Sequence, residues 1–222
     1  MSSAVIQLLV LAGIAIFLIL RLRSVLGTRE GFEKPPLSVN ESRDDRSGGQ
    51  PDFEVIEGGV DRDITDHAPE GSPTAQALAQ MKRVEPGFSV SEFLQGARGA
   101  YEMILMAFER GDIEQVAPFL DADVHEAFAE VLKHRAEQGL SVEATFIGVS
   151  ELALVAASFD PASDTGEMTV RFLGELTSIV RNADGEVVEG SDNKIKRQRD
   201  IWTFARRMGT GDPNWQLVAT DE

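Results

Sequence analysis

The side chains that could act as acids, bases or metal ligands are few in this sequence. Among its 222 residues there are three histidines and no cysteine, which excludes thiolate nucleophiles, disulfides and cysteine-ligated metals. His125 and His134 lie nine residues apart on one predicted helix, so their rings face opposite sides and cannot share a metal ion or a proton relay. His67 falls in a polar stretch. We therefore expect no catalytic residue, no metal site and no cofactor.

The acidic run DADVHE, from Asp121 to Glu126, begins like a calcium-binding loop. It lacks the glycine and the closing glutamate that such a loop requires at fixed spacing. We expect Asp121 or Asp123 to cap the following helix instead. His125 borders the apolar stripe of that helix, and we interpret it as a boundary residue rather than a general base.

A second concentration of charge is the basic run KIKRQR, which contains Lys194, Lys196, Arg197 and Arg199. On a strand these side chains point to both faces, a pattern typical of an exposed edge strand that charge protects against aggregation. The same residues could contact anionic lipid headgroups or an acidic partner, because each basic residue near such a surface contributes roughly 1 kcal/mol. Both interpretations stay open.

Aromatic and basic side chains alternate near the end of the chain, in RQRDIWTFARR. Such interleaving occurs in platforms for nucleic acid, but the formal net charge of −16 disfavours that partner, because phosphate binding needs a net basic face. Trp202 and Phe204 share one face of their strand, which predicts packing against helices. The residues expected to line the core or a pocket are Tyr101, Phe108, Trp202, Phe204 and Trp215.

The first 22 residues predict a transmembrane anchor. The run AVIQLLVLAGIAIFLIL, Ala4–Leu20, contains no charged residue, and about 20 residues of helix span the roughly 30 Å of a bilayer's hydrocarbon core. A cleavable signal peptide fits less well, because the basic residues follow the run and no small-residue cleavage site is present. Arg21, Arg23 and Arg29 indicate that the short N-terminus lies outside and the C-terminal part in the cytoplasm.

Residues 23–87 predict an acidic, disordered tether. Prolines, glycines and serines are frequent, and residues 30–87 hold 13 acidic against 6 basic side chains, a composition that buries too little apolar surface to fold. Two apolar islands interrupt it. Phe53–Gly59 could add a strand to a partner's sheet, or is a chance cluster, and residues 74–84 could form a short helix that lies on anionic lipid or leads into the domain.

Residues 88–222 predict an α+β domain in which helices cover one face of a curved antiparallel sheet. Ser91 is a candidate N-cap for a long central helix that Gly111 ends, and an amphipathic helix runs from Ala122 to Gly139. The apolar runs VEATFIGV, LALVAASF, MTVRFLGELTSIV, DIWTFAR and WQLVAT follow. Turn signals DPASDTG, NADG and GTGDPN separate the later runs and mark successive antiparallel strands.

Several of these segments resemble one family. The helix FLQGARGAYEMILMAFERGD, the following VAPFLDADVHEAFAEVLKHR and the ending DIWTFARR…DPNWQLVAT are similar to the C-terminal domain of TIM forty-four-like proteins. This family includes a subunit of the mitochondrial inner-membrane translocase and bacterial TimA-type proteins. The N-terminal FLILRLRSVLGTREGFEKPP also resembles the anchor of the bacterial members. The most specific pieces are Gly96–Glu102, the pair Gly111 and Asp112, and Trp202–Phe204 together with the later Asn214 and Trp215.

The resemblance implies a cone-shaped fold similar to nuclear transport factor two, with a curved sheet around a long helix and a pocket. It also implies a non-enzymatic, membrane-anchored adaptor at the cytoplasmic face of a bacterial inner membrane. Its implied partners are translocase components, other membrane proteins, translocating chains or chaperones, and anionic lipid. The alternative is a small-ligand-binding or enzymatic cone. Convergent polar groups in the pocket would favour an enzyme, and an apolar lining would favour the adaptor.

Overall fold

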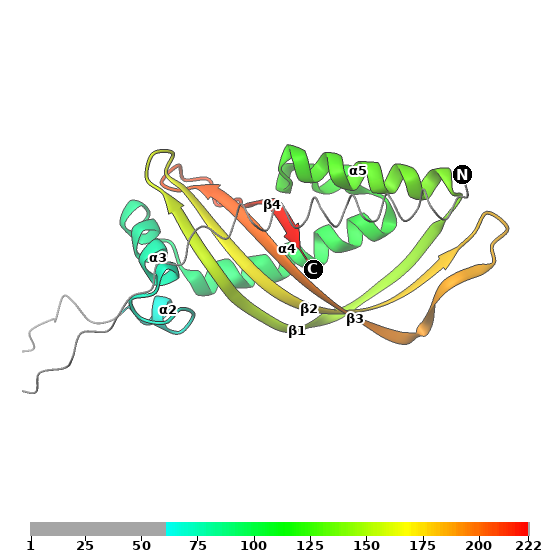
Figure 1. Ribbon diagram of the computed structural model, residues 1–222, viewed down its shortest axis with the longest axis horizontal. Coiled ribbons are helices and arrows are strands. Elements are labelled where there is room, and N and C mark those ends of the chain that lie inside the picture. Colours follow the sequence, from blue (N-terminus) through cyan, green and yellow to red (C-terminus); the bar gives the residue numbers. More distant parts are fainter. Residues whose placement is uncertain (1–60, 222) are drawn as a thin grey trace, which may run out of the picture. The chain divides into compact units, whose positions relative to one another are not determined.

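The computed structural model describes residues 61–221, in which helices come first and strands follow (Figure 1). This order confirms the predicted α+β class. The predicted anchor at residues 1–22 and the first part of the tether lie outside the described residues. Within residues 61–221, no helix is both long and apolar enough to cross a membrane. The elements are α2 (Arg62–Thr65), α3 (Pro73–Val84), α4 (Val90–Arg110), the 3-10 helix η1 (Ile113–Phe119), α5 (Ala122–Glu137), β1 (Ser141–Asp160), β2 (Thr165–Arg181), β3 (Val187–Arg207) and β4 (Gln216–Asp221).

The strands form one antiparallel sheet in the order β1-β2-β3-β4. Two of the predicted strands, VEATFIGV and LALVAASF, are a single strand, β1, and their predicted separation is wrong. No turn signal stands between them, and the extra residues Ile147, Ser150 and Val155 are taken up as bulges opposite β2. Bulges bend a strand and increase its twist, and the long strands curve around α4 in Figure 1.

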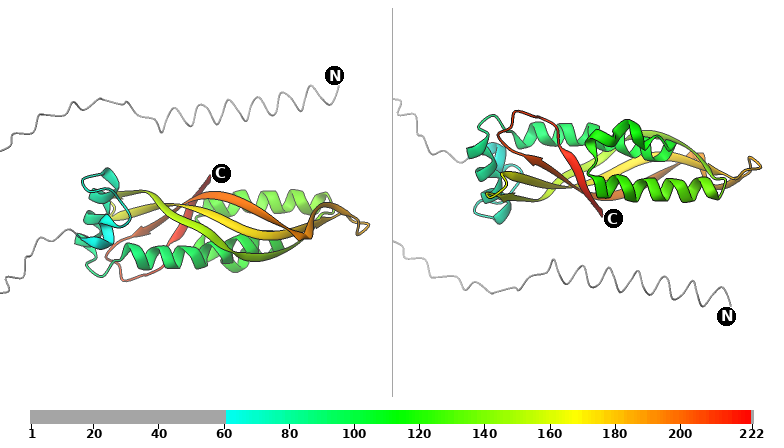
Figure 2. Two further views of the ribbon diagram at one scale, coloured as in Figure 1. Left: turned by 90° about the horizontal axis from the view of Figure 1, so that it is seen from below. Right: turned by 90° about the horizontal axis from the view of Figure 1, so that it is seen from above.

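Helices α4 and α5 lie on one side of the sheet, as the views from below and above show (Figure 2). The N-cap of α4 is Ser89, whose hydroxyl accepts a hydrogen bond from the backbone N–H of Glu92. The predicted N-cap, Ser91, is wrong by two residues. Ser89 and Glu92 have the spacing of a capping box, in which a serine at the N-cap is followed by a glutamate three residues later. Gly111 ends α4 in the left-handed conformation, with φ of 81°, as predicted.

The core lies between α4 and the sheet, and Tyr101 is at its centre. The Tyr101 ring stacks on Phe172 of β2 at 4.4 Å between ring centroids and lies 4.8 Å from the ring of Trp202. Its hydroxyl donates to the Asp200 carboxylate over 2.5 Å. This approach requires Gly174 on β2, because a Cβ atom there would clash with the Tyr101 hydroxyl.

Residues 61–87 belong to the folded domain, which corrects the prediction that they are part of a tether. The helix expected at residues 74–84 is present as α3, and its Leu78 and Met81 are fully buried. Met81 packs closely over Gly166 at the start of β2. The average composition of the stretch concealed this helix, whose few apolar residues all face the same side.

Asp63 of α2 holds this N-terminal part against α4. Its carboxylate accepts hydrogen bonds from the backbone N–H of Val90 at 2.8 Å and of Ser91 at 3.0 Å. Lys82 of α3 forms ion pairs with Asp63 and with Asp61, both at 2.8 Å. One carboxylate therefore connects α2, α3 and the start of α4.

Candidate functional site

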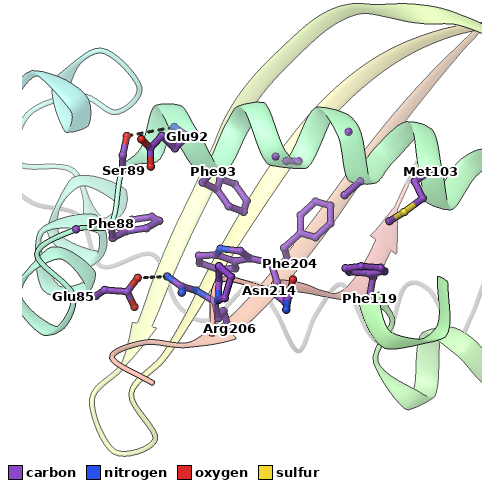
Figure 3. A pocket seen from close by; sticks show the side chains of 17 residues that line it. Glu85, Phe88, Ser89, Glu92, Phe93, Met103, Phe119, Phe204, Arg206 and Asn214 are labelled. Atoms are coloured by element: carbon purple, nitrogen blue, oxygen red, sulfur yellow. Dashed lines mark hydrogen bonds and ion pairs between the residues drawn. The ribbon is translucent and has the colours of Figure 1, made fainter. Parts of the chain in front are cut away.

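A groove of about 540 Å³ runs along the N-terminal half of α4 (Figure 3). Its other walls are the turn before α4, the end of η1 and the loop between β3 and β4. The lining is mostly apolar and aromatic. The residues that line it are Glu85, Gly87, Phe88, Ser89, Glu92, Phe93, Gly96, Ala97, Gly99, Ala100, Met103, Phe119, Phe204, Arg206, Pro213, Asn214 and Trp215.

The floor of the groove is a strip of small residues on α4. Gly96, Gly99 and Ala100 lie along it, and a Cβ atom added at either glycine would meet nothing within 4 Å. Each glycine inside a helix costs about 1 kcal/mol relative to alanine, and packing within the described chain does not require either of them. Met103 continues the strip and leaves 39% of its surface exposed. The backbone of α4 is thus open to close approach from outside.

Aromatic side chains from four places in the sequence form the walls. Figure 3 shows Phe88, Phe93, Phe119 and Phe204 pointing into the same space. The Trp215 ring lies 4.7 Å from the Phe93 ring and 6.0 Å from the Phe88 ring, between centroids. The result is a concave apolar surface of the size that small ligands or a few side chains of a peptide occupy.

A charge pair between the buried Arg206 and the half-buried Glu85 closes one end of the groove. Arg206 of β3 is only 8% exposed; it donates to Glu85 over 2.7 Å and to the carbonyl of Asp212 over 2.6 Å. Its guanidinium lies 5.0 Å from the centre of the Trp215 ring, within the range of a cation–π contact. The pair therefore ties the end of α3 to the loop that carries Trp215.

Glu85 is held in its charged form. Partial burial acts to raise its pKa, but hydrogen bonds from the Gly209 N–H, at 2.9 Å, and from Arg206 outweigh it and lower the pKa. The Nε atom of Arg206 is buried and has no hydrogen-bond partner in the described part of the chain. The groove thus has a single polar end and a long apolar floor.

The predicted aromatic residues divide between the core and the groove. Phe204 and Trp215 line the groove, whereas Tyr101 of α4 and Trp202 of β3 are buried between the helix and the sheet. Phe108 lies elsewhere, with its ring 4.9 Å from that of Phe128 on α5. Only two of the five predicted residues therefore meet at this site.

The predicted basic run lies on the outer half of β3, away from the groove. Lys194, Lys196, Arg197 and Arg199 are all exposed. Arg197 forms an ion pair with Glu175 of β2 at 3.0 Å. β4 pairs only with Ile201–Ala205, so residues 187–200 form an edge that carries no further strand in the part of the chain described.

The histidines are dispersed. His67 lies 3.2 Å from the Ser91 hydroxyl, His125 lies 3.2 Å from the Glu114 carboxylate, and His134 is exposed on α5. Across residues 61–221, no three histidine, aspartate or glutamate side chains gather closely enough to hold a metal ion. Asp121 caps α5 by accepting from the Asp123 N–H at 3.0 Å, as predicted.

The groove floor and the Glu85–Arg206 pair were not predicted from the sequence. Two glycines three residues apart inside a strong helix, in GARGA, were available as a signal, because a glycine at such a position often reflects a packing or functional requirement. Glu85 and Arg206 are 121 residues apart, and neither the spacing nor the type of these residues connects them.

Comparison with known proteins gives one family. The family model for the Tim44-like domain matches residues 74–222. The mitochondrial import inner membrane translocase subunit TIM44 of Homo sapiens is 22% identical over 147 residues, which cover 65% of this chain and 32% of that protein. The probable subunit tin-44 of Caenorhabditis elegans is 22% identical over 148 residues, covering 65% and 34%. The chain thus spans about a third of the length of these relatives.

Among solved structures, the intermembrane space region of the chloroplast protein ARC6 is similar, with a TM-score of 0.39 and 10% sequence identity. That similarity covers 58% of this chain and 94% of the other.

Proposed function

The chain belongs to the Tim44-like domain family, and on this premise we propose that it is a membrane-associated adaptor that binds other proteins during protein translocation. The curated relatives are named as subunits of a mitochondrial inner-membrane translocase. Because the chain matches only about a third of them, the proposal takes over their class, a binding subunit, and leaves their individual partners aside. Translocase components, other membrane proteins, translocating chains and chaperones are the partners that fit this class.

The observation that carries the proposal is the apolar groove on α4. Its aromatic walls and glycine floor suit an apolar segment of a protein, and the helix-in-groove mode, in which an amphipathic helix lays its apolar face into such a surface, matches its shape. Gly96 and Gly99 would let the backbone of that helix approach α4 closely. Only five of the seventeen lining residues are polar or charged, namely Glu85, Ser89, Glu92, Arg206 and Asn214, and this largely apolar lining favours binding over catalysis.

The location that we propose is the cytoplasmic face of a bacterial inner membrane. The support is the apolar run Ala4–Leu20 and the arginines that follow it, Arg21, Arg23 and Arg29, which favour a single span with the domain inside the cell. The segment between the span and residue 61 would let the domain reach partners beside its own anchor.

Site-specific crosslinking tests this function. A photoreactive amino acid replaces Met103 in the groove of the full chain, and another replaces Val155, which is 48% exposed on β1. After irradiation of native membranes, we expect translocase subunits, chaperones or other membrane proteins to be identified by mass spectrometry from the Met103 position and not from Val155. Identical products from both positions, or a bound small molecule as the only groove ligand, would contradict the adaptor.

A further inference from the structure

The outer half of β3 is a sheet edge with an unusual surface. Residues 187–200 pair with β2 on one side, and β4 covers only Ile201–Ala205 on the other. Unpaired strand edges offer backbone N–H and C=O groups to another strand. Among the described residues, this segment is the longest exposed part of β3.

Three large apolar side chains are exposed on this short segment. Val187, Val188 and Ile195 are 51%, 54% and 53% exposed. β-branched residues stabilise strands mainly by packing against cross-strand neighbours, and in this chain these three lie largely open. Their exposure points to a neighbour that the single chain does not supply.

The charges on the same segment are sorted by sign. Among the exposed residues from 186 to 199, Glu186, Glu189 and Asp192 precede Lys194, Lys196, Arg197 and Arg199, and the acidic Asp200 that follows is buried. Arg197 forms an ion pair with Glu175 of the same chain. The other six exposed side chains form no ion pair with another described residue. An acidic half therefore runs directly into a basic half along one strand. Charges of opposite sign directly opposite each other stabilise a strand pair, and like charges destabilise it.

We propose that this edge pairs with the same edge of a second copy of the chain, antiparallel and about a two-fold axis. A two-fold axis makes the contact self-complementary, so the acidic half of each strand meets the basic half of the other. With the axis near Ser191 and Asp192, the part of each strand that carries Val188 and Glu189 lies against the part of the other strand that carries Lys194 and Ile195. Parallel pairing in register would set like charges together, and an antiparallel pair therefore follows from the charge pattern.

Protection of the edge against aggregation is the competing explanation. β3 contains a bulge in which residues 192–195 oppose the single residue Thr177, and bulges and lysines are common on protected edges. Protection does not, however, require the two signs to occupy separate halves, nor does it account for three exposed β-branched residues. The separation of charge is the feature that a two-fold contact explains.

Cysteine crosslinking gives the first test, because the chain contains no cysteine of its own. Ser191→Cys places a thiol beside the proposed axis, and Ser158→Cys, on β1, is the matched control. The full chain is purified in a mild detergent and treated with a short bis-maleimide. We expect a covalent dimer from Ser191→Cys at protein concentrations where Ser158→Cys stays monomeric. A monomer from both variants would overturn the proposal.

Charge reversal gives the second test and separates a second copy from other partners. One variant combines Glu189→Lys with Asp192→Lys, another combines Lys194→Glu with Lys196→Glu, and both carry Ser191→Cys. Each alone should lose the crosslinked dimer at least about tenfold, which corresponds to about 1.4 kcal/mol, and a mixture of the two should recover it as a heterodimer. Glu126→Lys with Glu130→Lys, both exposed on α5, is the charge-matched control and should change nothing.

The pattern of failure identifies the alternatives. Loss of membrane or protein contacts on reversal of the basic half alone, with no effect of the acidic half, would mean that the edge binds an anionic surface and not a second copy. Failure of the mixture to recover the heterodimer would also contradict the two-fold contact. Neither outcome bears on the groove, so the adaptor function is tested separately.

Discussion

Single glycines in this domain serve opposite purposes. Gly174 lies under Tyr101, where a Cβ atom would clash with the phenol. Gly96 faces the open groove, where a Cβ atom meets nothing within 4 Å. The first is required by packing within the chain, and the second is not, so the same substitution should change stability in opposite directions at the two sites.

Gly174→Ala should lower the free energy of unfolding by about 1–3 kcal/mol, the usual cost of overpacking. Gly96→Ala should raise it by about 0.5–1 kcal/mol, because alanine restricts the unfolded chain and favours the helix. Urea denaturation of the two variants and the parent measures both changes. Equal destabilisation at both positions would show that the groove is filled by the chain itself.

The aromatic residues show what residue type and spacing predict. Alternation along the last long strand correctly placed Trp202 and Phe204 on its inner face. It did not predict the contact between Tyr101 and Asp200, which are 99 residues apart. Burial, followed by the hydrogen bond to Asp200, raises the pKa of Tyr101 far above its usual value, so the phenol stays protonated and remains a donor. Such a pair depends on the three-dimensional fold and has no local signature.

At the scale of elements, Asp63 links α2 and α3 to the start of α4. Partial burial acts to raise its pKa, but the hydrogen bonds from Lys82, Ser91 and Val90 outweigh it and hold the pKa well below the usual 3.8. A carboxylate whose pKa falls on folding stabilises the folded state above its unfolded pKa. This stabilisation is lost as the pH falls from about 4 through the lower pKa of the folded state.

Asp63→Asn should lower the free energy of unfolding at pH 7 by about 1–2 kcal/mol, the range for a lost helix cap and charged hydrogen bond. The difference from the parent should shrink as the pH falls below about 4, because the Asp63 carboxyl of the unfolded parent then takes up a proton while that of the folded parent stays charged, which favours unfolding. Denaturation at a series of pH values measures this. Asp66→Asn, at an exposed position one turn along the chain, is the control; an equal effect there would contradict the role of Asp63.

Element prediction succeeded where local signals are strong. α4 has a cap, a long apolar stripe and a terminal glycine, and α5 has Asp121 and Gly139, so both helices were predicted nearly to their ends. The stretch that contains α3 was assigned to the tether because its average composition is polar. The helix is stabilised by only two large side chains, Leu78 and Met81, which pack against the sheet, and average composition does not detect such a contact. β1 was divided in two because bulges at Ile147 and Ser150 interrupt the period of two that identifies strands.

At the scale of the whole molecule, one domain carries two surfaces with different proposed roles, the groove on α4 and the outer half of β3. The groove on α4 is apolar with one polar end, and the outer half of β3 is charged and exposed. They lie on different elements, so an adaptor could bind a partner through the first while the second joins two copies. The family resemblance predicted the adaptor class and a pocket, but not which residues form it, because the groove arises where α4, η1 and the loop before β4 meet.

The central claim is that the groove on α4 binds the protein partners, and the most direct test is to fill the groove by changing one residue. Gly99→Trp places a large side chain in the groove, whereas Gly99→Ala adds one carbon at the same site. Both full-length variants are recovered from crosslinked native membranes, and their partners are quantified by mass spectrometry. The account predicts that Gly99→Trp unfolds at the parent's temperature but loses its translocase or membrane-protein partners at least about tenfold, while Gly99→Ala keeps them. A folded Gly99→Trp chain that retains every partner would contradict it.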